Sequence, residues 1–353
     1  MLSFSTLRRL ALKHLVLVLA SAHFSGCTDS QCARAVDTQG DRAGAQTQPV
    51  GSRKVAGAKD LTLDLGDKVT MTLVRIPPGR FLMGAPQAEK DSFKESQHEM
   101  TISQAFYMGM THVTVDQFAA FVKDSSYTTD AEKAGWTRGN MLEDSHTPYY
   151  QANGVSWHKP PGDEVDLAKG DHPVVAVSWN DAQAFCLWAS KTTGQRVVLP
   201  TESQWEYACR AGTTTVFPWG DNPDDGKGWA NCADKSFKKR IHSPMRAFLQ
   251  LGTRESFFSW DDGFVLTSPV GTFKANAFGL YDMIGNASQW CQDLKGVDTP
   301  PNGPGTENWR MTRGGSWFVG PETCNSAMRF ADAPDFSSSE TGFRVVVLAA
   351  GAD

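Results

Sequence analysis

The chain has no long hydrophobic run after its first 27 residues and no excess of basic charge. A membrane-spanning helix needs roughly 20 consecutive apolar residues, and no later segment supplies them. The formal net charge of -5 argues against nucleic acid as the main partner, because surfaces that bind nucleic acid are basic. The sequence also shows no internal repeat.

The composition is that of an ordinary globular protein, with 40% hydrophobic and 21% charged residues among 353. All eleven tryptophans lie between Trp136 and Trp317, and the chain contains 32 glycines and 18 prolines. This distribution predicts one large, loop-rich domain with an aromatic core.

Residues 1–27 have the pattern of a secretory signal peptide. Basic residues precede the apolar run 15–20, and small residues lead to Cys27. The ending Ser-Gly-Cys resembles a bacterial lipobox, in which Cys27 would be lipidated, although Phe24 stands where that motif favours leucine. Residues 28–60 have too few large apolar side chains to fold and are predicted to be a flexible tether. We therefore expect export to the bacterial periplasm, with the lipid as the only membrane anchor; plain secretion remains the alternative.

Hydrophobic periodicity and capping residues give a coarse secondary structure for the domain at 61–350. Ser or Thr followed three residues later by an acidic or amide side chain is typical of a helix start. We expect helices at 114–122, 178–192 and 205–210, a turn at 77–79, and strands at 69–76, 80–84, 100–107 and 174–178. We expect loop at 130–169 and a solvated basic face at 235–246. The fold class is α+β.

Residues 275–293 combine large apolar side chains with Gly279, Gly285 and Asn286, without helical or strand periodicity. Buried irregular backbone must find partners for its polar groups, and a metal ion is one such partner. Asp282 and Gln289 carry the hard oxygen atoms that calcium takes. A tight loop without an ion is the alternative.

Four motifs resemble those of the formylglycine-generating enzyme (sulfatase-modifying factor) family. They are LPTESQWEYACRAGT, GLYDMIGNASQW, RGGSW and PDFSSSETGFRVV, and the similarity runs from about Val74 to Val347. The resemblance implies a coil-rich single domain with the formylglycine-generating-enzyme fold, which is related to C-type lectin-like domains. It also implies a protein or peptide substrate, such as a sulfatase, whose cysteine is oxidised.

The resemblance further implies two calcium sites. The first would use the Asn231 side chain, the Cys232 carbonyl, the Asp262 carboxylate and the Phe264 carbonyl. The second would use the Asp282 carboxylate, the Gly285 and Ala287 carbonyls and the Gln289 amide. The second set departs from the family pattern, because the family usually has glutamate where Gln289 stands. A lost charge weakens calcium affinity.

Active family members bind copper(I) through two cysteines that follow the RGGS motif. Here Val319 occupies the first position, and Cys324 falls at the second in a loop about three residues shorter than the family's. One thiol cannot form a two-coordinate copper(I) thiolate site, so copper-dependent oxidation is predicted to be defective. The candidate catalytic residues that remain are Cys324, Ser316 and Arg329.

The family also has a disulfide that begins at the position of Cys209. Its partner position is Ser326 here, two residues from Cys324. Cysteines of exported proteins are commonly paired, so we expect a Cys209–Cys324 bond.

Two functions stay open at this point. The first is an exported oxidative modifier of protein or peptide side chains, of the sulfatase-maturation type. The second is a catalytically degenerate, lectin-like binding module on a lipid tether, or an enzyme similar to the periplasmic protein that matures the pyoverdine chromophore, which lacks the cysteine pair.

Overall fold

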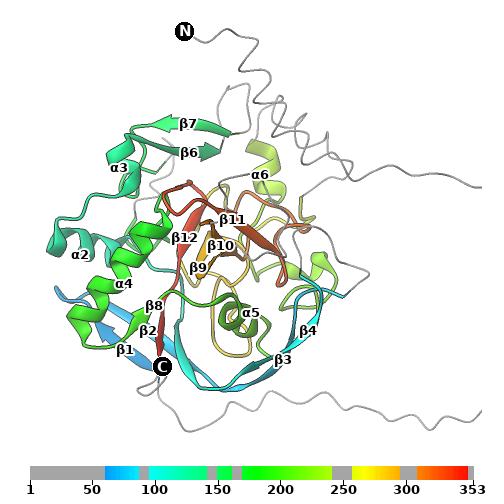
Figure 1. Cartoon of the computed structure of the whole chain (residues 1–353). Helices are drawn as coiled ribbons and strands as arrows, with labels where there is room; N and C mark the ends of the chain where they lie inside the picture. Colours follow the sequence, from blue (N-terminus) through cyan, green and yellow to red (C-terminus); the bar gives the residue numbers. More distant parts are fainter. Residues whose placement is uncertain are drawn as a thin grey trace, which may run out of the picture. The chain divides into compact units, whose positions relative to one another are not determined.

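The computed structural model describes residues 60–86, 95–140, 149–160, 169–240, 257–294 and 308–348. The predicted leader, Cys27 and nearly all of the tether lie outside these residues. The α+β prediction is confirmed, with helices and antiparallel strands in one domain (Figure 1). Within the described part, no helix is both long enough and apolar enough to cross a bilayer.

The main sheet has five strands in the order β1-β2-β5-β13-β8, and all neighbours are antiparallel. The strands are β1 (Leu61–Asp64), β2 (Thr70–Ile76), β5 (Phe106–Gly109), β13 (Val346–Leu348) and β8 (Val197–Val198). Successive side chains of a strand point to opposite faces. Leu73 and Val347 accordingly join one hydrophobic cluster, whereas Val74 and Val346 join another. The sheet thus separates two cores.

The helices α2 (Val115–Ser125) and α4 (Trp179–Thr193) cover the first face (Figure 1). Each begins with the predicted capping box, Thr114 with Gln117 and Ser178 with Asp181, and each ends in a left-handed residue. Phe118 and Phe185 stack at 6.1 Å between their ring centroids in the shared core.

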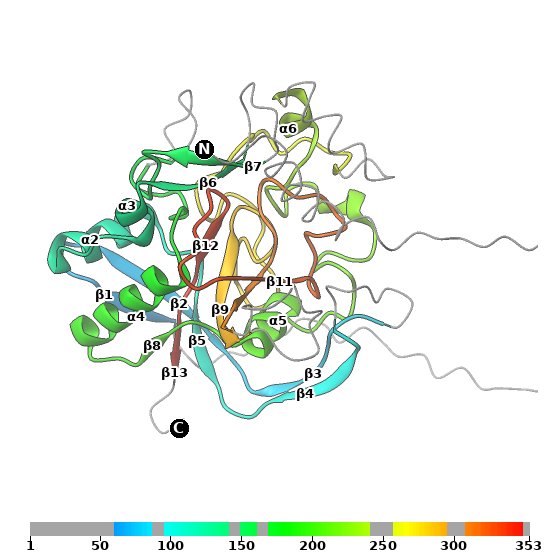
Figure 2. The same cartoon turned by 45° about the horizontal axis from the view of Figure 1, so that its top comes forward.

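The second face packs against α5 (Glu202–Arg210) and a four-stranded sheet with the order β11-β10-β9-β12. Its strands are β9 (Ser288–Leu294), β10 (Arg310–Arg313), β11 (Arg329–Asp332) and β12 (Thr341–Phe343). A two-stranded ribbon of β3 (Gly79–Met83) and β4 (His98–Ile102) runs alongside α5 (Figure 2). Side chains of the motifs 199–213 and 279–290 and Cys324 after the RGGS motif pack on this side of the main sheet.

Three local predictions were wrong. Residues 130–169 include α3 (Asp130–Ala134), which begins at a further capping box of Thr129 with Glu132, and the paired strands β6 (Trp136–Asn140) and β7 (Tyr149–Asn153). The segment 174–178 is buried but forms no strand: Ala176 has a left-handed φ of +58°, and its N–H donates to the Ser338 carbonyl. Residues 100–107 are divided between β4 and β5.

Two surface segments complete the described chain. Pro223–Gly226 is a 3-10 turn (η2) that begins after Asn222. The basic segment contains a short helix, α6 (Lys235–Arg240). Its lysines project outward while Phe237 is buried, so it has one solvated face and one core face.

Candidate functional site

The loop that connects the candidate residues is held by side-chain amides. Asn276 accepts hydrogen bonds from the backbone N–H groups of Phe278 and Leu280 through its Oδ1 atom. Asn286 does the same further along, since its Oδ1 accepts from Ser268 N at 2.9 Å and its Nδ2 donates to the Ser268 carbonyl. The expectation of irregular backbone is confirmed for 275–287, where protein groups satisfy much of it, but it is wrong for 288–293, which belong to strand β9.

The first candidate calcium set comes together in one place. The Asn231 amide nitrogen donates to the Leu266 carbonyl, while its Oδ1 atom is buried without a hydrogen-bond partner among the described residues. The two carboxylate oxygens of Asp262 accept from Cys232 N and Phe264 N, at 3.1 and 2.8 Å. Those two bonds bring the backbone of Cys232 and Phe264 to Asp262. The four predicted ligand residues are therefore neighbours, with Asn231 preceding Cys232, but the groups that face Asp262 are backbone N–H groups and not the predicted carbonyls.

The electrostatics of this set also fit a cation. Burial raises the pKa of Asp262 to about 7, with nearby Asp234 adding to the rise against hydrogen bonds from Phe264 and Cys232. Burial likewise raises the pKa of Asp234. Carboxylate and amide oxygens are of the type that calcium takes as ligands. In donor chemistry, the residues of the first set fit the ion.

The second candidate set is arranged differently. Gln289 Oε1 already accepts from Trp205 Nε1 at 2.7 Å and from Arg344 Nε at 2.6 Å. The buried Arg344 guanidinium also donates to the carbonyls of Tyr281 and Asp282. A protein cation therefore already lies among the oxygens that would surround the metal. Its charge opposes a divalent ion there.

A buried histidine occupies another acceptor of the second set. His112 Nε2 lies 2.8 Å from the Ala287 carbonyl, and burial, with Arg344 adding, lowers the pKa of His112 to about 3. The neutral ring must carry its proton on Nε2 to donate to this carbonyl. Among the described side-chain oxygens of the second set, Asp282 Oδ1 is buried without a hydrogen-bond partner, and burial raises the pKa of this carboxyl to about 6. This donor set does not fit calcium as the first one does.

The RGGS motif ties the site to α5. Arg313 is fully buried and forms an ion pair with Glu206, and it donates to the carbonyls of Ala327 and Met328 at 3.1 and 2.9 Å. The next residue, Gly314, accepts a hydrogen bond from Gly285 N at 3.0 Å. The arginine thereby fixes the backbone after Cys324. The glycine joins the RGGS motif to the 275–293 loop.

The prediction of a Cys209–Cys324 bond is wrong. The structure leaves Cys209 unbridged, with its sulfur 3.8 Å from Ser326 Oγ. Cys324 instead places its sulfur 3.0 Å from that of Cys232, and both side chains have no exposed surface. Burial, with Cys324 adding, raises the pKa of the Cys232 thiol well above its ordinary value. The trimmed loop turns Cys324 toward the first calcium set and away from α5.

The three candidate catalytic residues do not share an open site. Ser316 is fully buried and donates to Glu340 at 2.7 Å. Arg329 forms two hydrogen bonds with Glu202, at 2.9 and 2.7 Å. Val319, at the position of the first copper cysteine, packs against both neighbouring hydrophobic clusters. Ser316 and Arg329 thus hold the fold in the described structure.

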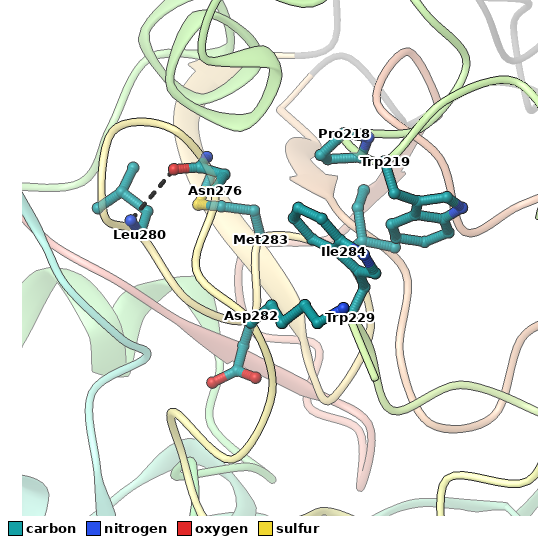
Figure 3. Close-up of a pocket in the computed structure, with 9 residues that line it drawn as sticks. Pro218, Trp219, Trp229, Asn276, Leu280, Asp282, Met283 and Ile284 are labelled. Carbon is teal, nitrogen blue, oxygen red and sulfur yellow. Dashed lines mark hydrogen bonds between the residues drawn. The ribbon is translucent and has the colours of Figure 1, made fainter. Parts of the chain in front are cut away.

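The described surface also has a half-open depression lined by aromatic residues, shown in Figure 3. It has an empty volume of about 230 Å³, between Trp219, Trp229, Lys274 and the Asn276–Ile284 loop. Lys274 Nζ lies 5.7 Å from the centre of the Trp229 ring. Asp282 contributes to the lining, but its carboxylate points away from the tryptophans (Figure 3) and accepts from Gly271 N. No sequence motif predicted this depression.

The fold and these motifs agree with comparisons to known proteins. Residues 66–349 match the sulfatase-modifying factor enzyme 1-like domain, so the chain belongs to this family. It is 34% identical to the formylglycine-generating enzyme of Bos taurus over 299 residues, covering 77% of this chain and 73% of the relative. The Thermomonospora curvata enzyme of the same name is 33% identical, covering 78% and 93%.

A relative described as inactive is almost as similar. The inactive C-alpha-formylglycine-generating enzyme 2 of Bos taurus is 30% identical, covering 80% of this chain and 90% of the relative. Among solved structures, PvdO from Pseudomonas aeruginosa has a TM-score of 0.60 at 24% identity, covering 83% of this chain and 100% of that one. Treponema denticola variable protein 1 has a TM-score of 0.56 at 21% identity, covering 82% and 99%. These structures support the fold alone.

Proposed function

We propose that the chain is an exported, catalytically degenerate member of this family, which binds a protein or peptide through the family scaffold without oxidising it. The observation that carries the proposal is the location of Cys324. Its sulfur is buried against Cys232, and Val319 replaces the first copper cysteine. A copper(I) site for dioxygen chemistry needs two thiolates that the substrate can reach.

The alternative is oxidative modification of a substrate cysteine, as the names of the relatives from Bos taurus and Thermomonospora curvata indicate for those proteins. The two functions differ in turnover. We therefore expect the purified chain, supplied with copper(I) and dioxygen, to bind a labelled CxPxR peptide but to leave its mass unchanged. A peptide with serine in place of the cysteine controls for binding, and the Thermomonospora curvata enzyme controls for conversion.

Either half of that result can fail separately. Formylglycine in the peptide, seen by mass spectrometry, would establish the oxidase and refute the degenerate reading. Absence of saturable binding would refute the binding module. Co-expression with a sulfatase that carries the CxPxR motif extends the same test to a folded partner.

Calcium at the first set is the second part of the proposal. The ion would be held by Asn231, Asp262 and the carbonyls of Cys232 and Phe264, and it would neutralise the buried carboxylate. An ion that binds only the folded state stabilises it by about 2.7 kcal/mol when its free concentration is a hundredfold above Kd.

We therefore expect a chelator to lower the Tm of the wild type and to have little effect on Asp262→Asn. The matched control is Asp261→Asn. The Asp261 carboxylate is adjacent to Asp262 in the chain, but it is exposed and pairs with Lys239 at 2.9 Å. This control should respond to the chelator as the wild type does. A wild-type Tm that ignores both chelator and added calcium would contradict the site.

Lipidation of Cys27 is the proposed route of membrane attachment, supported by the lipobox-like Ser-Gly-Cys ending. A radiolabelled fatty acid should be incorporated by the wild type in a bacterial host, and Cys27→Ser should abolish the label. An unlabelled soluble periplasmic product, cut before Cys27, would show simple secretion instead.

A further inference from the structure

Two cysteines that no sequence motif pairs lie sulfur to sulfur inside the domain. Cys232 follows Asn231 in the first calcium set, and Cys324 follows the RGGS motif, 92 residues later. Their sulfur atoms are 3.0 Å apart. The other described cysteines, Cys186, Cys209 and Cys291, are buried without a sulfur neighbour in the described structure.

The backbone encloses this sulfur pair on two sides. A Cβ atom on Gly285 would lie 2.7 Å from the Cys232 sulfur, and one on Gly315 would lie 2.9 Å from the Cys324 sulfur. Both glycines have φ in the left-handed region, at +78° and +69°. Because Gly285 N also donates to Gly314 O, the two loops close over the pair and leave no space for another group between the sulfurs.

A metal ion does not suit this geometry. Two thiolates on one ion at about 2.3 Å and a tetrahedral angle would place their sulfurs about 3.8 Å apart, and a linear copper(I) site needs more. The described residues contain no cluster of three or more His, Cys, Asp or Glu side chains that could hold a metal. A disulfide requires the sulfurs to approach by only about 1 Å, to about 2.05 Å.

We infer that Cys232 and Cys324 form a disulfide in the mature protein, which joins the first calcium loop to the RGGS loop and consumes the family-position thiol. Both S–H bonds break, one S–S bond forms, and two electrons and two protons pass to an external disulfide, protein or small-molecule, which becomes two thiols. Because both side chains are fully buried, this exchange takes place before the loops close. The inference rests on the proposed export, since an oxidising compartment supplies the external disulfide.

The sequence allows a direct test by peptide mapping. Trypsin places each of the five domain cysteines in a separate peptide: 170–191, 197–210, 228–235, 275–295 and 314–329. The purified full-length chain is refolded in a glutathione redox buffer, its free thiols are alkylated, and it is digested without reduction. We expect 228–235 linked to 314–329, and the other three peptides alkylated.

Two variants keep the outcome specific. Cys232→Ser should make 314–329 fully alkylated, and Cys186→Ser should leave the linked peptide at its wild-type level. A link from 314–329 to 197–210, or all five peptides alkylated, would overturn the inference on the wild type alone. Refolding in vitro tests the cysteine pairing without depending on export. If the pair links in vitro but the chain stays in the cytoplasm of its host, the proposed export is refuted and the pairing is kept.

Discussion

Cys232→Ser is expected to lower the free energy of unfolding of the oxidised protein by up to about 4.6 kcal/mol. This is the chain-entropy value for a bond that closes a loop of 92 residues, and native-state strain reduces it. Cys324→Ser should cost a similar amount, and the double variant little more than either single one, because each removes the same bond. Urea unfolding at fixed pH measures all three.

A reductant provides the internal control. It should lower the stability of the wild type toward that of the two variants and leave the variants nearly unchanged. Cys186→Ser, at a buried thiol in the other core, keeps the proposed disulfide and should lose stability with the reductant as the wild type does. A reductant-independent wild type would contradict a stabilising disulfide.

Arg313→Met is expected to destabilise the fold by about 3–5 kcal/mol. The arginine and Glu206 are both fully buried, and removal of one partner of a buried pair leaves the other charge poorly compensated. Arg210 also bonds Glu206 at 2.9 Å, which places the expected loss toward the lower end. The carbonyls of Ala327 and Met328 lose a donor as well.

The matched control for this prediction is the exposed pair Lys123–Asp67, whose side chains are 75% and 68% accessible. Lys123→Met should leave the midpoint of the same urea titration nearly unchanged, because solvent screens this exposed pair. If Arg313→Met costs no more than this control, the RGGS arginine is not the structural anchor described here. Glu206→Gln tests the same pair from the other side and should also destabilise.

Local chemistry explains which elements the sequence could predict. The helices that begin after Thr114, Ser178 and Thr201 follow capping boxes, which are readable from four residues. The capping box at Thr129 has the same signal, but it lies in a polar segment without apolar periodicity. The segment 174–178 has strand composition, but its partners lie on non-neighbouring loops, so its pairing could not be predicted locally.

The candidate site likewise has residues that the sequence could predict and contacts that it could not. Asn231 and Asp262 were predicted through the family motifs, and the structure brings them together. The Arg344 and His112 contacts at the second set, and the Cys232–Cys324 pair, depend on segments far apart in the chain. A family resemblance assigns residues to positions, but it does not show what a residue contacts when the usual partner has been replaced. The cysteine pairing predicted from the resemblance was therefore wrong.

Copper(I) stoichiometry on the purified protein tests the central claim most directly. After reduction and anaerobic titration with copper(I) against a competing chelator, the wild type is expected to bind no copper at the family position, and the Cys324→Ser variant should give the same isotherm. The Thermomonospora curvata enzyme serves as the positive control. One equivalent of copper bound by the wild type and lost in Cys324→Ser would contradict the account, because it would show a working thiolate site where the structure places a buried sulfur pair.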